Sequence, residues 1–140
     1  MNIKRLLIAI IVLYFLLWGE AMLFYDVLLA DPLADATRVM QSEAAQAAMT
    51  WQLIAYAVMV ALFCFIFTKN HEGRGIGEGI RYGLLLGGYS ATVEFIWATS
   101  VGISLATSLL IALIAIVMWV SAGAVLSLIY KPKSAGAKTD

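Results

Sequence analysis

The chain has 140 residues, of which 63% are hydrophobic and only 13% charged, and its mean hydropathy is +0.93. A soluble domain of this size has too much surface to cover with so few charged groups, so the composition indicates an integral membrane protein. The formal net charge is zero, and no basic field favours nucleic acid as a partner. The single cysteine, Cys64, excludes an internal disulfide and lies in an apolar run typical of a buried side chain.

Four apolar stretches predict an all-α fold, a bundle of four transmembrane helices that span about residues 6–28, 51–68, 80–100 and 105–130. The first apolar run is longer than that of a signal peptide and lacks a good cleavage site, so we expect it to be retained. Residues 1–133 then form a single membrane domain. Residues 134–140 are small and polar, which predicts a flexible cytoplasmic tail.

A polar segment, residues 31–50, separates the first two spans. Asp31 followed by Pro32 is a helix-start signal, with the aspartate as N-cap and the proline in the first turn. Apolar residues then recur on one side, at Leu33, Ala36, Val39 and Met40. We expect a short helical segment lying at the membrane interface. Ser42 can cap the next helix, whose first turns stand in water before Trp51 enters the bilayer.

The distribution of Lys and Arg predicts the orientation, because cytoplasmic loops carry an excess of both. Eight of the nine lie near the two termini and the connection at residues 69–81, whereas only Arg38 lies on the other side. Both termini and this glycine-rich connection therefore face the cytoplasm. We expect lipid head groups to contact the cations nearest the spans, Lys69, Arg74, Arg81, Lys131 and Lys133.

Small residues form two surfaces on the predicted helices. In the third span they recur every four residues, at Gly79, Gly83, Gly87 and Ala91, and in the fourth they include Ser121 and Gly123. Small side chains let membrane helices approach closely. Both surfaces therefore predict close packing against a neighbouring helix.

Two carboxyl groups interrupt the apolar spans. At 1.5 Å per residue, Glu20 and Glu94 fall roughly 21 Å and 18 Å above the cytoplasmic boundary, and Tyr56 of the second span falls near the same level. Ser90 and Trp97 lie within one turn of Glu94, on its side of the helix. These five side chains are the predicted intramembrane polar site.

The chemistry of this site has two interpretations. The apolar interiors of the spans contain no Lys or Arg, so neither acid has an evident salt-bridge partner. A carboxylate at mid-membrane costs several kcal/mol, or roughly 3 on insertion scales. Either the two acids form a proton or cationic-substrate site between the first and third helices, or each is protonated and links helices by hydrogen bonds.

Other motifs do not support catalysis or cofactor binding. The run Gly73, Gly75, Gly77 and Gly79 lacks a preceding strand and a Walker lysine, so it predicts a flexible connection and no phosphate site. The only histidine, His71, lies on the cytoplasmic side, away from the level of Glu20 and Glu94. We therefore expect no metal, no cofactor and no Ser-His-acid triad.

The cytoplasmic connection resembles a known signature. The segments Glu72-Gly73-Arg74-Gly75 and Glu78-Gly79-Ile80-Arg81-Tyr82-Gly83 resemble those of a family of uncharacterised bacterial four-span integral membrane proteins. Further similarities are the N-terminal Met-Asn-Ile-Lys, the Leu-Leu-Ala before the outer loop, and the Leu-Ile-Tyr-Lys-Pro of residues 128–132. The resemblance implies the same topology in a bacterial inner (cytoplasmic) membrane and no particular activity. It also implies that Arg81-Tyr82-Gly83 is a packing or lipid-anchoring device.

Little of the chain lies outside the predicted spans, and no catalytic constellation is present. We expect a non-enzymatic accessory or structural subunit whose small-residue surfaces pack against other membrane subunits or against a second copy. The alternative is a small proton- or cation-coupled transporter or channel subunit that uses Glu20 and Glu94, acting as a homo-oligomer. An enzyme acting on lipid is a distant third hypothesis.

Overall fold

The structure is a computed structural model that describes residues 2–34 and 43–130. These residues are helical apart from short turns, which confirms the predicted all-α class. The elements are α1 (Ile3–Ala21), η1 (Met22–Leu28), α3 (Glu43–Asn70), α4 (Ile76–Ser100) and α5 (Leu105–Ile129). The predicted interfacial helix falls largely at residues 35–42, outside the described residues. The tail at 134–140, with Lys131 and Lys133 before it, lies outside them as well.

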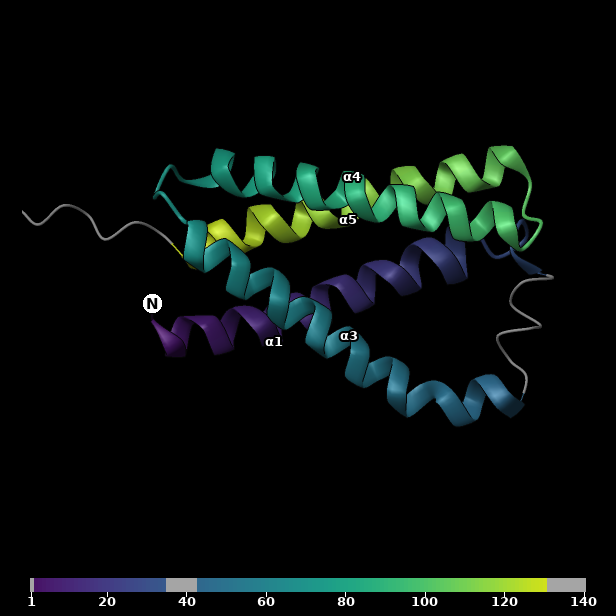
Figure 1. Cartoon of the computed structure of the whole chain (residues 1–140), viewed down its shortest axis with the longest axis horizontal. Helices are drawn as coiled ribbons and strands as arrows, with labels where there is room; N and C mark the ends of the chain where they lie inside the picture. Colours follow the sequence, from purple (N-terminus) through teal and green to yellow (C-terminus); the bar gives the residue numbers. More distant parts are fainter. Residues whose placement is uncertain (1, 35–42, 131–140) are drawn as a thin grey trace, which may run out of the picture.

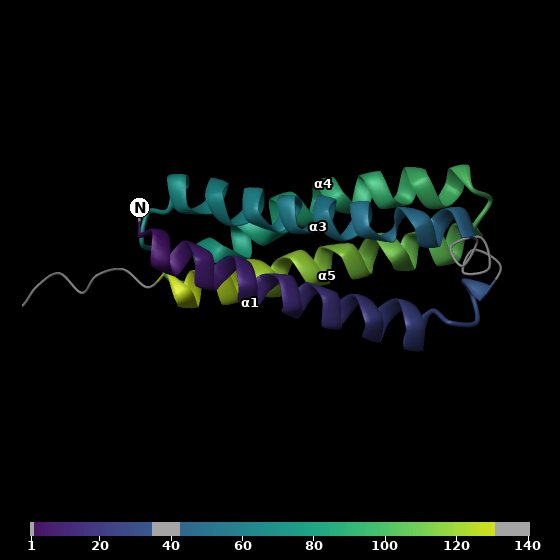
Figure 2. The ribbon, with the colours of Figure 1, turned by 90° about the horizontal axis from the view of Figure 1, so that it is seen from below.

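The four long helices alternate in direction and form a bundle (Figure 1). The N-terminus, the connection between α3 and α4, and the end of α5 lie together at one end of it (Figure 2). At this end the Tyr130 hydroxyl donates a hydrogen bond of 3.1 Å to the Asn2 carbonyl oxygen. The described cations on which the orientation was predicted therefore belong to one end of the bundle.

Three helices are long and apolar enough to cross a membrane: Ile3–Leu28, Ala47–Asn70 and Leu105–Ile129. Helix α4 is not among them, because it carries Glu78, Arg81 and Glu94 together with several glycines, which lower its hydropathy. Among the described residues, the first, second and fourth apolar stretches thus correspond to helices that are long and apolar enough to cross a membrane.

Helix α1 does not continue as a regular α-helix to the end of its span. It passes into the π-helix η1, after which the Leu29 N–H donates to the carbonyl oxygen of Phe24, five residues back, at 2.9 Å. Such turns widen the backbone and often occur at functional sites. The sequence pattern predicted a single span here and did not show this change.

The small-residue ridge of α4 faces α5. A side-chain carbon built on Gly79 would collide with the carbonyl oxygen of Gly123, and one built on Gly83 would collide with that of Trp119. Glycine is therefore required at both positions for the backbones to approach this closely. Further along the ridge, Gly87 faces Ile116, and Ala91 is buried.

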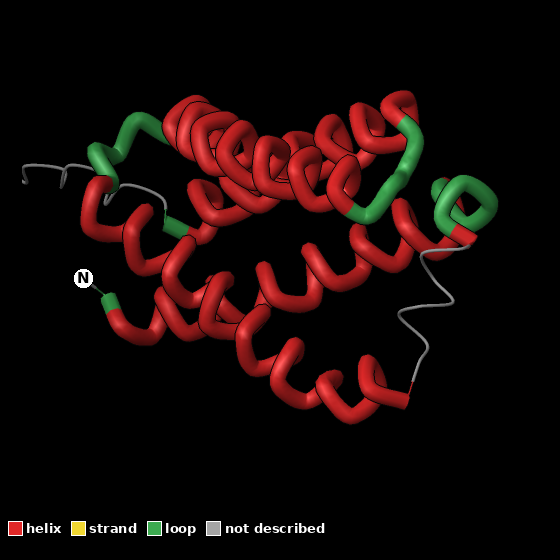
Figure 3. The backbone as a smooth tube through the Cα atoms, turned by 45° about the vertical axis from the view of Figure 1, so that its right-hand side comes forward, coloured by secondary structure: helices red, strands yellow, loops and turns green. Residues whose placement is uncertain are grey.

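Helix α3 packs mainly through its second half, while Tyr56 in the first half packs against Tyr14 of α1. Its buried side chains are Val60, Phe63, Cys64 and Phe67. Before Val60 the helix is largely exposed, with Trp51 at 73% and Val58 at 53%. Figures 1 and 3 show α3 crossing α1 and diverging from the α4–α5 pair toward its N-terminal end.

Tyr82 attaches the packed half of α3 to α4. Its hydroxyl donates to the carbonyl oxygen of Phe63 at 2.8 Å, and its ring lies 4.8 Å from the Phe63 ring. The Phe63 ring in turn contacts Trp119 of α5 at 4.7 Å. Helix α3 is consequently joined to the bundle near the end that holds the start of α1 and the end of α5, and it is separated from α4 at the other end.

Candidate functional site

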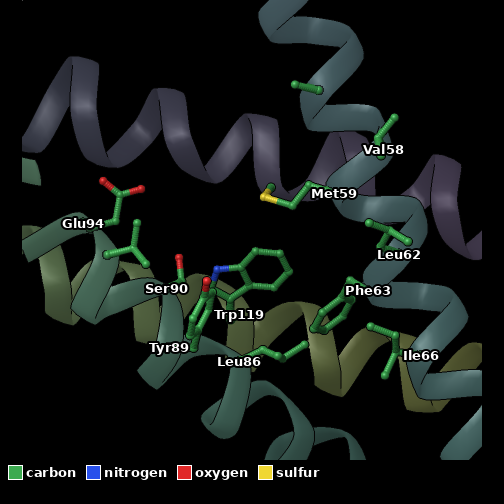
Figure 4. Close-up of a pocket in the computed structure, with 12 residues that line it drawn as sticks. Val58, Met59, Leu62, Phe63, Ile66, Leu86, Tyr89, Ser90, Glu94 and Trp119 are labelled. Carbon is green, nitrogen blue, oxygen red and sulfur yellow. The ribbon is translucent and has the colours of Figure 1, made fainter.

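The divergence of α3 leaves a groove between α3 and α4, with α5 beneath it (Figure 4). The groove has a volume of about 530 Å³. The wall formed by α3 is apolar and includes Val58, Leu62 and Ile66. The wall formed by α4 carries polar groups, those of Tyr89, Ser90 and Glu94. The side chain of Trp119 extends from α5 toward the groove.

A smaller chamber of about 150 Å³ adjoins this groove on the side of α1. Both spaces are lined by Met59, Ser90, Glu94 and Trp119. The chamber differs from the groove in its polar lining, because it adds two tyrosines, Tyr25 from η1 and Tyr56 from α3. The groove and the chamber together are called the Glu94 site below.

Glu94 lies where the two spaces adjoin. Its carboxyl group and the Ser90 hydroxyl both point away from α4 (Figure 4). Within residues 2–34 and 43–130, no side chain hydrogen-bonds to the Glu94 carboxyl group. The nearby Ser90, one turn before it on α4, shares both linings. The carboxyl group therefore faces free space bounded by protein.

Tyr56 contributes a second polar atom without a partner. Its hydroxyl oxygen is buried and makes no hydrogen bond within the part of the chain that the structure describes. The ring is held edge-on against Tyr14 of α1, with centroids 5.4 Å apart. A buried hydroxyl without a partner is unusual and calls for a specific explanation, such as a bound polar group.

Glu20 has a different environment. Its two carboxyl oxygens lie 2.7 Å and 2.9 Å from the Ser121 hydroxyl, which donates to this carboxyl group from α5. Ser121 therefore links α5 to α1 through Glu20, and Glu20 is absent from the lining of both spaces.

The structure thus divides the predicted polar site. It brings Tyr56, Ser90 and Glu94 to one chamber, and it directs Glu20 to Ser121. Trp97 is 39% exposed and lines neither space.

Among the chamber-lining residues that were not predicted are Tyr25, Met59 and Trp119. The sequence does contain one signal for Tyr25, since Leu17, Ala21 and Tyr25 recur every four residues and all line the chamber. Met59 and Trp119 carried no signal that separates them from ordinary lipid-facing or core residues.

A cluster of polar groups links the two ends of the connection between α3 and α4. The Glu78 carboxylate accepts hydrogen bonds from the backbone N–H groups of Glu72, at 2.6 Å, and Arg74, at 2.9 Å. The Nδ1 atom of His71 lies 3.1 Å from the same carboxylate. Burial opposes the charged form, but the two N–H groups and the imidazole outweigh it and hold the pKa of Glu78 below its ordinary value of 4.5.

The described cations of this end make local contacts. Arg74 pairs with Glu72 at 2.7 Å on the surface, and the Lys69 ammonium lies 5.5 Å from the centre of the Phe65 ring. The connection therefore has a defined hydrogen-bonded structure, although the sequence predicted a flexible one. Contacts of Lys69, Arg74 and Arg81 with lipid head groups stay a prediction.

No family model matches the chain, and neither a curated protein nor a solved structure is significantly similar to it. The resemblance of the cytoplasmic connection to a family of four-span proteins accordingly stays a prediction.

Proposed function

We propose that this chain is a non-enzymatic integral membrane protein that binds a lipid-soluble ligand in the groove between α3 and α4, next to Glu94. In this proposal all four helices cross a bacterial inner membrane, with both termini in the cytoplasm. Support for α4 as the fourth span comes from its length and its neighbour. It has 25 residues, roughly 37 Å of helix, against a hydrocarbon core of roughly 30 Å, and it packs along α5, itself a candidate span.

The observation that carries the proposal is the position of Glu94 at the junction of groove and chamber. An intramembrane carboxyl group without a partner costs several kcal/mol, and such groups are by default candidates for function. The groove volume of about 530 Å³ lies within the range of roughly 300–1,000 Å³ typical of small-molecule sites. Its lining is apolar with a few convergent polar groups, as in such sites.

The accessory-subunit hypothesis rested on two small-residue surfaces, and both are now accounted for within the chain. Gly79 and Gly83 of α4 pack on Gly123 and Trp119 of α5, while Ser121 donates to Glu20. These surfaces are therefore not free for a second protein. What still favours a subunit role, as the second candidate, is the first half of α3, most of whose described side chains are exposed.

The geometry does not favour a transport site that uses Glu20 and Glu94 together. The Glu20 carboxyl group is engaged by Ser121 and lines neither the groove nor the chamber. A transport site in the groove and chamber would therefore contain one carboxyl group, that of Glu94, and not two.

The binding of a neutral apolar fluorophore tests the proposed function. N-phenyl-1-naphthylamine added to the detergent-solubilised protein should bind saturably and accept energy from Trp119. Ala55→Trp places a large side chain in the groove and should abolish the saturable signal. The matched control Leu53→Trp, on an exposed position of α3 outside the lining, should keep it. A signal identical to that of empty micelles would contradict the proposal.

The molecular mass of the protein in mild detergent tests the second candidate. A subunit role predicts a homo-oligomer or a stoichiometric co-purifying membrane protein. A stable monomer that still binds the fluorophore would rule out that candidate and leave the ligand-binding proposal standing.

A further inference from the structure

The two halves of the Glu94 site differ in chemistry. The groove is bounded mainly by aliphatic and aromatic side chains, with Val58, Leu62 and Ile66 on α3. The chamber is smaller and brings the Tyr25 and Tyr56 rings close to Glu94. A ligand that fits both halves has an apolar body and one compact polar head.

The charge of the head follows from the groups around it. Among the residues that the structure describes, Glu94 is the one Asp, Glu, Lys or Arg side chain that lines either space. A cation next to it would neutralise the carboxylate, whereas an anion would be repelled. Among the described residues, no group of three His, Cys, Asp or Glu side chains could hold a metal ion. The complementary head is thus an organic cation.

Aromatic rings around the chamber support the same assignment. Tyr25, Tyr56 and Trp119 all line it, and the faces of such rings attract cations, including quaternary ammonium groups. The Tyr56 hydroxyl, buried and without a partner in residues 2–34 and 43–130, adds a polar group beside the chamber that Tyr56 lines. Desolvation within the bundle strengthens both effects.

We propose that the ligand of the Glu94 site is a lipophilic organic cation, with its charged head in the chamber and its apolar body in the groove. This inference rests on the proposed function, because it requires that the groove bind a lipid-soluble molecule. The inference adds two properties of the ligand: its positive charge, and its orientation with the head in the chamber and the body in the groove. The open side of the groove, between α3 and α4, is the path by which such a molecule enters from the bilayer.

A pair of single-chain amphiphiles with opposite charge tests the inference. Dodecyltrimethylammonium and dodecyl sulfate have the same apolar chain, and each is titrated calorimetrically at low concentration into the protein in phosphatidylcholine nanodiscs. We expect the cation to bind at least about tenfold more tightly than the anion. In Ala55→Trp the saturable binding of the cation should disappear.

Two conservative variants locate the head. Glu94→Gln keeps the shape of the side chain and removes its charge, so the affinity for dodecyltrimethylammonium should fall by about tenfold or more. Tyr56→Phe removes only the hydroxyl, whose dipole lies beside the charged head, and should weaken binding by about threefold. The matched control Asp26→Asn removes an exposed carboxyl group of η1, outside both linings, and should leave the affinity unchanged.

The outcomes separate the inference from the proposed function. Equal affinity for the two amphiphiles, or an unchanged affinity in Glu94→Gln, would overturn the cationic ligand while the neutral fluorophore still binds. If Glu94→Gln does not fold, the preference of the wild-type protein for the cation and the weaker binding of the cation to Tyr56→Phe decide the question. Disulfide cross-linking of two copies through Val58→Cys would assign the groove to a second copy of the chain and overturn the inference.

Discussion

Two faces of α4 have different surroundings: one packs against α5 and the other borders the groove. The face with Gly79, Gly83 and Gly87 packs on α5 with backbone against backbone. The neighbouring face, with Tyr89, Ser90 and Glu94, looks onto a groove across which α3 stands apart. Glycine permits the first contact because it has no side chain to separate the helices. On α3 the facing positions hold Val58, Leu62 and Ile66, which line the groove and stay exposed.

The comparison shows how a helix can be held in place by packing on one face while a side chain on its other face stays open to a ligand. The contact with α5 holds α4 in place along most of its length, so Glu94 projects from a rigid support. The opposite wall, with Val58, Leu62 and Ile66, lies beside the attachment of Phe63 to Tyr82 and remains exposed. Sites built on rigid helices hold their side chains more accurately than sites on loops.

The largest expected effect comes from breaking the α4–α5 contact. Gly83→Leu would drive a large side chain into the backbone of Trp119 and Val120. Over-packing usually costs roughly 1–3 kcal/mol, and we expect at least the upper figure because backbone, which cannot move aside, is displaced. Unfolding of the protein in mixed micelles by a denaturing detergent measures the loss.

The control for this change is Gly88→Leu. No atom outside its own stretch of helix lies within 4 Å of the position that its side-chain carbon would occupy, although Gly88 shares the same helix. Leucine also favours helix over glycine at both positions. Equal destabilisation by the two variants would show that α4 does not pack on α5 through its glycine ridge.

A smaller effect is expected from Tyr82→Phe, which loosens the attached half of α3. The change removes the hydrogen bond from the Tyr82 hydroxyl to the Phe63 carbonyl oxygen and keeps the ring contacts. We expect a loss of about 1 kcal/mol in unfolding free energy. Spin labels on the first half of α3 and on α4 should also report a wider spread of distances.

Tyr89→Phe is the matched control, because Tyr89 lies on α4 and is 72% exposed. It should leave both the stability and the distance distribution unchanged. If Tyr82→Phe behaves in the same way, α3 is held by the aromatic contacts alone.

The smallest expected effect concerns the connection between α3 and α4, and it depends on pH. Because the folded protein holds the pKa of Glu78 below 4.5, this carboxylate stabilises the fold fully above pH 4.5. The contribution is lost as the pH falls through the lower pKa of the folded state. Thermal unfolding at a series of pH values should show that Glu78→Gln removes this part of the acid dependence.

Glu72→Gln serves as the control for the pH experiment. Its carboxylate forms a surface pair with Arg74, and such pairs contribute little to stability. The acid dependence of Glu72→Gln should therefore match that of the wild-type protein. Should Glu78→Gln keep it as well, the capping of residues 72–74 by Glu78 would not contribute to folding.

Much of the fold was predictable from local patterns. Apolar runs located the helices, and the four-residue spacing of Gly79, Gly83 and Gly87 identified the side of α4 that packs closely. Counting residues along each helix also predicted that Tyr56, Ser90 and Glu94 lie at a similar depth. In the structure all three line one chamber. Such features can be predicted from the sequence because each depends on the rise and period of a single helix.

The remaining features of the site depend on contacts between helices. Matching depth suggested Glu20 as the companion of Glu94, but rotation about the helix axis directs Glu20 to Ser121. A hydrophobicity pattern likewise does not predict the π-helix that contains Tyr25 or the divergence of α3 from α4. Depth is set by one helix, whereas direction is set by how neighbouring helices pack.

By itself, the sequence determined that this is a helical protein with membrane-spanning character and that an acid lies beside a ridge of small residues. Only the tertiary structure decided that the ridge belongs to α5 and that the acid faces a groove. The physical reason is that a periodic pattern defines a face and its need for burial, but any complementary surface can satisfy that need. Here Gly123 and the backbone of Trp119 satisfy it, and Glu94 is left with open space.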